Sequence, residues 1–206
     1  FQIMNTEAPN KHILRPDHID HFSAYTVDTF DYVAEPLRAE LLKKNMTKAP
    51  LLGGTIGYDV AGALTGNWFL KGRNSAREEY WVNNMSIVYD HLDPSQIRVS
   101  LGNFGGYPKA YGVRGNAPAP ASVTAASGII TYELMKFDYY AGDKRWDGLH
   151  YTEGIVARNT EEGVGTVMFQ LMPDGTHPND KGYEVWAKAI AQPLRRLLRG
   201  EPAGKS

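Results

Sequence analysis

The sequence of 206 residues contains no cysteine. Disulfide bonds, zinc sites with thiolate ligands and thiol nucleophiles are therefore excluded. The formal net charge is only -1, so no overall charge draws the chain toward nucleic acid or anionic membranes. The sequence also lacks a long apolar run and a charged N-terminal segment followed by an apolar one. We therefore expect a soluble chain with neither a signal peptide nor a transmembrane segment in the given sequence, and the cell compartment is left open.

The composition is that of an ordinary globular protein. Hydrophobic residues make up 42% of the chain and charged residues 22%, which argues against general disorder. The length fits one main domain with a substantial core.

Most of the chain before residue 172 has the short alternating runs that are typical of strands. Gln96 to Leu101 alternates polar and apolar residues strictly, which predicts a strand with one face in solvent. A hairpin is expected over 55–70, with Ala61-Gly62 at its turn, and Asp93-Pro94 marks a second turn. Further strands are expected at 85–89, 128–135 and 164–171, with an irregular aromatic-rich stretch at 136–162.

Two segments have helical patterns. Pro36 suits the first turn of a helix that ends near Lys44. Apolar residues recur at three- and four-residue steps from Tyr183 to Leu198, which predicts a long amphipathic helix. The expected fold class is α+β: a mainly antiparallel β-sheet body, open or barrel-like, with one helix in the N-terminal half and a long C-terminal amphipathic helix. Residues 1–171 would form the β-rich domain, and residues 172–206 a loop and helix packed on it.

A carboxylate precedes a histidine by three residues in the turn before this last helix. A histidine can take the proton of a nucleophilic hydroxyl or water, and a carboxylate can fix its tautomer and stabilise the imidazolium. Gly175 and Pro178 suit a tight loop, because glycine permits unusual backbone angles and proline fixes its own. Asp174 and His177 are therefore candidate catalytic residues, as orienter and general base.

The run Asp174-Gly175-Thr176-His177-Pro178-Asn179, followed by Gly182-Tyr183 and Trp186-Ala187, resembles the last characteristic block of the SGNH (GDSL-type) esterases and acylhydrolases. The resemblance covers residues 172 to 198 and is carried mainly by Asp174 to Ile190. It implies that Asp174 and His177 are two members of a catalytic triad. A parallel α/β sandwich is the fold that membership in that family would imply.

The family's other elements do not occur in this chain. There is no Gly-Asp-Ser element near the N-terminus, Gly66-Asn67 is not followed by Asp, and no Gly-x-Ser-x-Gly elbow occurs. The nucleophile is left open between a serine and a metal-bound water. By loop or strand-end position, the candidate serines are Ser75, Ser100 and Ser127.

Carboxylates and imidazoles alternate near the N-terminus. Asp17, His18, Asp20 and His21 are candidate ligands for a divalent metal, the one cofactor that the sequence suggests, because these side chains bind zinc, manganese and iron. The competing interpretation is a polar segment that enters a helix, on which Asp17 and His21 would share a face.

Residues 50–171 have a second, less specific resemblance, to an uncharacterised β-rich domain of bacterial proteins. It is carried by the runs Gly54-Thr55-Ile56, Gly62 to Phe69, His91 to Ser95 and Val123 to Gly128. It implies a sheet-based fold and no particular activity.

Two functions are therefore open. One is a hydrolase of carboxylic esters or lactones, whose partner would be a small molecule and neither nucleic acid nor a membrane. The other is a non-catalytic β-rich binding or accessory domain, which a ligand site lined by Trp68, Tyr139 and Trp146 would favour.

Overall fold

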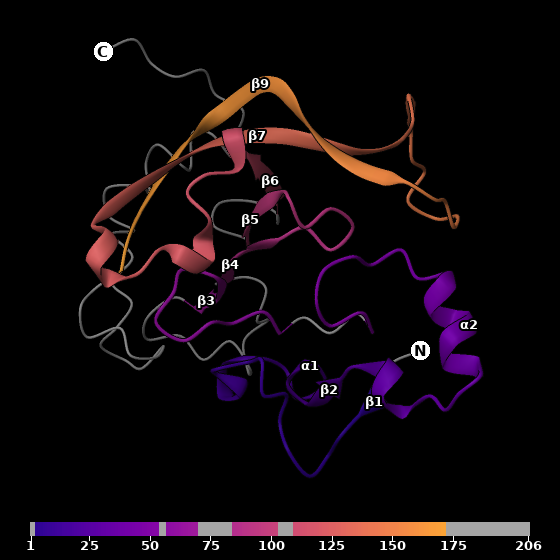
Figure 1. Cartoon of the computed structure of the whole chain (residues 1–206). Helices are drawn as coiled ribbons and strands as arrows, with labels where there is room; N and C mark the ends of the chain where they lie inside the picture. Colours follow the sequence, from indigo (N-terminus) through magenta and orange to yellow (C-terminus); the bar gives the residue numbers. More distant parts are fainter. Residues whose placement is uncertain (1–2, 54–56, 70–83, 103–108, 172–206) are drawn as a thin grey trace, which may run out of the picture.

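The computed structural model describes residues 3–53, 57–69, 84–102 and 109–171 (Figure 1). Every strand pair in these ranges is antiparallel. A small sheet joins β1 (Ile3–Met4) to β2 (Thr26–Val27). The main sheet has the order β3-β4-β5-β6-β7-β8, and β9 pairs with β7. Its strands are β3 (Gly66–Phe69), β4 (Asn84–Tyr89), β5 (Ile97–Leu101), β6 (Lys109–Val113), β7 (Ile129–Ala141), β8 (Lys144–Arg145) and β9 (Ile155–Gln170).

Helices are short in the described residues. The α-helices are α1 (His21–Tyr25) and α2 (Leu37–Lys43), and both belong to the N-terminal part. Single turns of 3-10 helix occur at η1 (Pro16–His18), η2 (Thr29–Tyr32), η4 (Arg114–Asn116), η5 (Pro120–Ser122) and η6 (Ala125–Ser127). Within the described ranges, no helix is long and apolar enough to cross a membrane.

The β4–β5 hairpin is closed by one aspartate. Asp90 Oδ1 accepts hydrogen bonds from the backbone N–H groups of Leu92 and Asp93, both at 2.9 Å. The backbone N–H of Asp90 donates to the carbonyl of Gln96 at 2.9 Å. A short polar side chain that bonds the backbone two and three residues on is a favoured way to build a turn. The turn predicted at Asp93-Pro94 is confirmed, and so are the two strands beside it.

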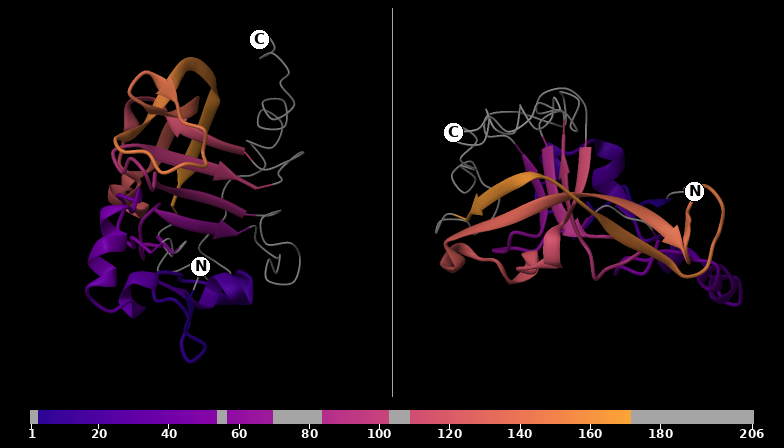
Figure 2. Two further views of the ribbon diagram at one scale, coloured as in Figure 1. Left: turned by 90° about the vertical axis from the view of Figure 1, so that its right-hand side faces the viewer. Right: turned by 90° about the horizontal axis from the view of Figure 1, so that it is seen from above.

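Strands β7 and β9 form a long two-stranded ribbon that crosses the sheet (Figure 2). Strand β6 pairs with β7 only at Gly112↔Met135 and Val113↔Leu134. The register between β7 and β9 shifts on either side of Met135, as expected at a β-bulge, which bends a strand pair and increases its twist. The crossing lets one half of the ribbon pack on each face of the sheet.

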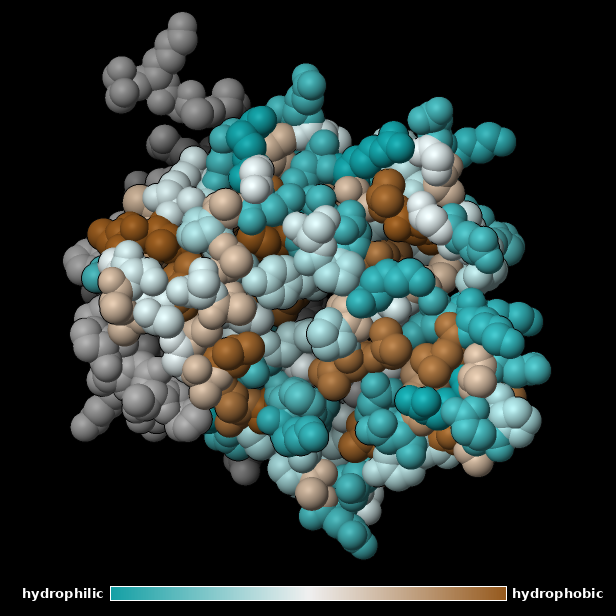
Figure 3. All heavy atoms as spheres, in the orientation of Figure 1, coloured by the Kyte–Doolittle hydropathy of each residue, from teal (hydrophilic) through white to brown (hydrophobic). Residues whose placement is uncertain are grey.

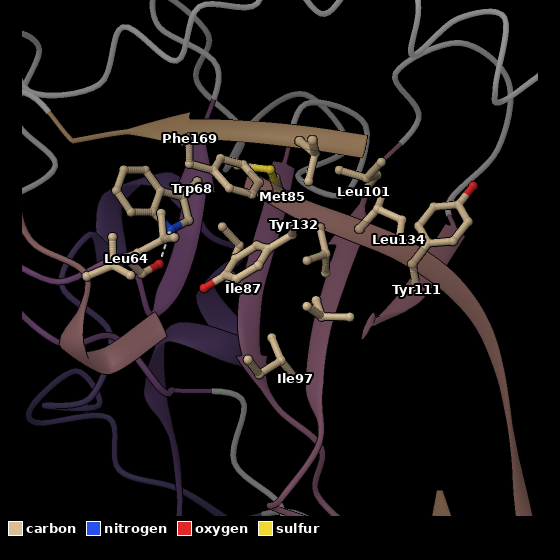
Figure 4. Packing of buried hydrophobic residues seen from close by; sticks show 14 of the residues in the cluster. Leu64, Trp68, Met85, Ile87, Ile97, Leu101, Tyr111, Tyr132, Leu134 and Phe169 are labelled. Carbon is tan, nitrogen blue, oxygen red and sulfur yellow. Dashed lines mark hydrogen bonds between the residues drawn. The ribbon is translucent and has the colours of Figure 1, made fainter. Parts of the chain in front are cut away.

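One half of the ribbon, formed by residues 129–134 of β7 and 165–170 of β9, packs on the hydrophobic core (Figure 4). Tyr132 and Phe169 from this half belong to the same buried cluster as Ile87, and the two aromatic rings meet edge to face with centroids 5.9 Å apart. Trp68 donates its indole N–H to the carbonyl of Leu64 at 2.9 Å, so burial leaves no unpaired donor on that ring. Burial of each such side chain contributes about 1.5–3 kcal/mol.

The other half of the ribbon, formed by residues 137–141 of β7 and 155–159 of β9, covers the opposite face of the sheet. Arg98 and Val99 are neighbours on β5, so their side chains point to opposite faces. Val99 is fully buried in the core, and Arg98 is only 5% exposed because Phe137 and Asn159 of the ribbon lie over it. The expectation of one face in solvent at Gln96 to Leu101 is therefore wrong at Arg98, whereas Ser100 on the same face is partly exposed.

The predicted fold class is corrected. The described residues are mainly β rather than α+β, with two short α-helices and no closed barrel among them. No long C-terminal helix stands among the described elements, and residues 172–206, which include the expected helix, lie outside the described residues.

Several local predictions are also settled. The helix near Pro36 and the strands at 85–89, 128–135 and 164–171 are confirmed. The stretch 136–162 is irregular only in part: β7 continues to Ala141 and β9 begins at Ile155, but residues 146–154 form a loop. The hairpin at 55–70 is wrong: residues 57–60 form no strand, and Asp59 instead accepts hydrogen bonds from the backbone of Leu14 and Asn67.

Candidate functional site

The predicted catalytic pair lies outside the described residues, as does Ser75. The other two candidate serines are in structural positions. Ser100 stands inside β5, opposite Ser86 and Ala110. The hydroxyl of Ser127 accepts the backbone N–H of Thr124 in a capping box. Neither hydroxyl is hydrogen bonded to a histidine in the part of the chain that the structure describes.

Two of the four candidate metal ligands lie together: Asp17 Oδ2 is 3.4 Å from His18 Nε2, and Arg15 contacts both side chains. Asp17 forms an ion pair with Arg15 at 2.8 Å, which holds the pKa of its carboxyl below the usual range. Asp20 caps α1 by accepting the backbone N–H of Ser23 at 2.9 Å. The ring of His18 packs on Phe69 and that of His21 on Tyr25. Over the described ranges, no group of three or more histidine, aspartate or glutamate side chains is placed to hold a metal ion.

A buried charged cluster joins the sheet to the ribbon instead. Arg98 Nε donates to Asp90 Oδ2 at 2.8 Å, and both side chains are almost fully buried. The hydroxyl of Tyr139 on β7 donates to the same carboxylate oxygen at 2.5 Å. Burial and this hydrogen bond raise the pKa of Tyr139 well above its usual value. Asp90 therefore accepts donors from its own turn, from β5 and from the ribbon.

The surroundings of Arg98 leave little free space. Its guanidinium lies 3.8 Å from the centroid of the Phe137 ring, a favourable cation–π contact. Asn159 donates to the carbonyl of Val113 at 3.0 Å, and its Oδ1 lies 3.5 Å from Arg98 Nη1. A Cβ atom on Gly112 would lie 2.0 Å from that same oxygen. This cluster is a structural joint rather than a reactive site.

A line of aromatic rings runs outward from the cluster. The Tyr139 ring meets Phe137, His91 and Trp146 edge to face or nearly so, with centroid distances of 5.6, 6.2 and 6.1 Å. The backbone N–H of Trp146 donates to the carbonyl of Tyr139 at 2.8 Å. Because Tyr139 is anchored to Asp90, the position of Trp146 is tied to the buried cluster.

We call residues 138–158 the ribbon tip. It contains the end of β7, the strand β8, the loop to β9 and the start of β9. Three large hydrophobic side chains there are well exposed: Leu149 at 83%, Tyr151 at 48% and Val156 at 39%. On the same face as Val156, the guanidinium of Arg158 lies 4.9 Å from the centroid of Tyr140.

The tip loop contains a carboxylate–imidazole pair. Asp147 Oδ2 lies 2.5 Å from His150 Nδ1. This contact lowers the pKa of Asp147 and raises the pKa of His150. Both side chains are exposed, at 50% and 81%. The pair therefore orders the loop in contact with water, without the desolvation that usually accompanies a catalytic pair.

Sequence reasoning named Tyr139 and Trp146 but missed the Asp147–His150 pair, although one signal for it was present. Asp147-Gly148-Leu149-His150 has the same Asp-Gly-x-His pattern as Asp174 to His177. In the described loop this pattern closes the carboxylate onto the ring nitrogen, with Gly148 at a φ of 79°. Of the three residues expected together, Tyr139 and Trp146 are in contact, but Trp68 lies apart from them in the hydrophobic core.

Hydrophobic side chains do not form one continuous apolar area on the face drawn in Figure 3, where hydrophilic groups separate them.

Compared with known proteins, the chain matches no family model, and neither a curated protein nor a solved structure is significantly similar to it.

Proposed function

We propose that the described part of this chain is a non-catalytic binding domain that recognises a protein partner through the ribbon tip. The observation that carries the proposal is the exposure of Leu149, Tyr151 and Val156 beside the anchored Trp146. Tryptophan, tyrosine and arginine dominate the energetics of protein interfaces, and they do so where the side chain is held in place before binding.

The anchoring of the tip supports this function physically. Tyr139 reaches Asp90 with its hydroxyl and Trp146 with its ring. A side chain already fixed in the free protein loses little conformational entropy on binding, so more of its contact energy becomes affinity. Exposed hydrophobic side chains beside a Trp146 that is held by hydrogen bonds and ring contacts are therefore better suited to recognition than the same residues on a free loop.

Peptide display on the purified chain tests the proposal. Peptides selected on the parent protein should bind at the tip, so Leu149→Asp and Trp146→Ala should each weaken them at least about tenfold, the effect of losing a contact worth more than 1 kcal/mol. Leu52→Asp is the matched control, because Leu52 is also exposed, at 37%, but lies outside the tip. Peptides that bind both tip variants as tightly as the parent would refute the assignment of the surface.

A second candidate is a hydrolase of carboxylic esters or lactones that uses Asp174 as orienter and His177 as general base. It is supported by the sequence block at 172–198 and by the Asp147–His150 pair, in which the same Asp-Gly-x-His pattern forms a carboxylate–imidazole hydrogen bond. The antiparallel order of the described strands differs from the parallel sandwich that the SGNH resemblance implies.

Turnover of short aryl esters and lactones separates the two functions. A hydrolase should lose about 100-fold or more in rate on His177→Ala, the usual contribution of a general base. His150→Ala is the matched control, since it removes the other histidine of the same pattern. Repeating the assay with a metal chelator shows whether a metal-bound water is the nucleophile. Equal and weak rates for the parent and both variants would contradict the hydrolase and leave the binding function.

A further inference from the structure

One carboxylate organises the loop that follows β8. Asp147 Oδ1 accepts the backbone N–H groups of Leu149 at 2.9 Å and His150 at 3.1 Å, while Oδ2 contacts His150 Nδ1. Trp146 closes the loop from the other side, because its indole N–H donates to the carbonyl of His150 at 2.8 Å. The loop therefore holds the Trp146 indole and the backbone of residues 147–150 in one arrangement.

We propose that residues 146–150 form a pH-sensitive latch, which is closed most firmly when Asp147 is ionised and His150 is protonated and which sets the position of Trp146 at the ribbon tip. The proposal concerns regulation of the binding surface, and its functional consequence rests on the proposed binding function.

Protonation strengthens the closing contact without being required for it. A neutral imidazole can donate from Nδ1 to a carboxylate, but the imidazolium makes a charge-assisted hydrogen bond, which is stronger. The hydrogen bond and the charge of Asp147 raise the pKa of His150 above its ordinary value of 6.5. The contact with His150 and the two backbone N–H groups lower the pKa of Asp147 below 3.8.

These two shifts define the pH window of the latch. The contribution of His150 is complete below 6.5 and is lost as the pH rises through its raised pKa. The contribution of Asp147 is complete above 3.8 and is lost as the pH falls through its lowered pKa. Closure is therefore most favourable in mildly acidic solution and weakens on the way to alkaline pH.

Arg145 and Glu153, two charged residues near the latch, have partners of their own. Arg145 pairs with Asp138 at 2.7 Å, and Glu153 accepts the hydroxyl of Tyr151 at 3.2 Å. The Tyr151 hydroxyl also lies 3.5 Å from the carbonyl of Lys43, the last residue of α2. Among the described residues, Asp147 is the charged group that raises the pKa of His150.

Nuclear magnetic resonance on the full chain tests the latch directly. From about pH 5.5 to about pH 8, on either side of the ordinary histidine pKa, hydrogen-exchange protection at the Leu149 and His150 amides should fall. We expect a twofold to fivefold loss, roughly the effect of an exposed ion pair. The Trp146 indole N–H resonance should shift with the same midpoint as the His150 ring, above 6.5.

Two variants make the test specific. Asp147→Asn should return the His150 midpoint toward 6.5 and remove the pH dependence of the Trp146 resonance. Asp138→Asn removes a carboxylate from the same ribbon tip and should leave both unchanged, because Asp138 pairs with Arg145.

The latch is refuted if His150 titrates identically in the parent and in Asp147→Asn, or if the Trp146 resonance does not follow His150. The affinity of display-selected peptides, measured over the same pH range, is a separate readout. If the Trp146 resonance follows the titration of His150 but Trp146→Ala does not change the affinity of the selected peptides, the latch is supported and the binding function is contradicted.

Discussion

Replacing Arg98 by methionine should destabilise the protein far more than replacing Arg145 by methionine. Both arginines make a short ion pair with an aspartate, at 2.8 Å for Arg98–Asp90 and 2.7 Å for Arg145–Asp138. Burial is what separates them. The side chains of Arg98 and Asp90 are 6% and 1% exposed, whereas those of Arg145 and Asp138 are 70% and 34% exposed.

The magnitude follows from what each substitution leaves behind. Removing one partner of a buried pair costs about 3–5 kcal/mol, because the other charge stays buried. Asp90 would keep the N–H groups of Leu92 and Asp93 and the Tyr139 hydroxyl. One nitrogen of Arg98, Nη2, is buried without a partner already, so its removal relieves a defect. We therefore expect a loss near the lower end, about 3 kcal/mol.

The exposed pair gives the comparison value. Surface ion pairs contribute about 0–1 kcal/mol, because water screens the charges and the long side chain must be ordered. Arg145→Met should therefore change the free energy of unfolding by less than about 1 kcal/mol.

Urea unfolding followed by circular dichroism measures both variants. The midpoint should fall with an unchanged dependence on denaturant, which indicates that only stability has changed. In a thermal scan, Arg98→Met should lower the melting temperature by about 6–12 °C, at roughly 2–4 °C per kcal/mol for a chain of this size. Equal losses for the two variants would refute the conclusion that the buried cluster joins the ribbon to the sheet.

Two further predictions concern packing and pH. Gly112→Ala should lower the free energy of unfolding by about 1–3 kcal/mol, the usual effect of overpacking, because the new Cβ would lie 2.0 Å from Asn159 Oδ1. Gly163→Ala is the control, since the nearest atom to its Cβ would be the end of the flexible Glu133 side chain, at 3.1 Å. Matching urea midpoints for the two variants would contradict the close approach of Asn159. Burial raises the pKa of Tyr132 from 10.0 to about 12, so stability should fall as the pH rises from 10 through 12, where only the unfolded chain ionises this group. Tyr132→Phe should abolish that part of the pH dependence in alkaline unfolding curves.

The sequence alone determined the local elements whose pattern is set by near neighbours. Strand β4, the Asp93-Pro94 turn and helix α2 were predicted because alternation, a turn dipeptide and a helix-starting proline act within a few residues. Asp20, predicted as a candidate metal ligand, instead caps α1, although its capping contact is equally local.

Tertiary structure decided everything that depends on the crossing of the ribbon. The alternation of polar and apolar residues predicted that Arg98 faces solvent, because such a pattern does not reveal that a second layer will cover the polar face. An irregular stretch was predicted at 136–162, which holds for the loop at 146–154 but not for Phe137 to Tyr140 on β7, since neither the bulge near Met135 nor the pairing of β7 with β9 has a local signature. Folding brings Asp90, from the turn after β4, against Tyr139 of β7, and no local pattern predicts a contact between residues 49 positions apart.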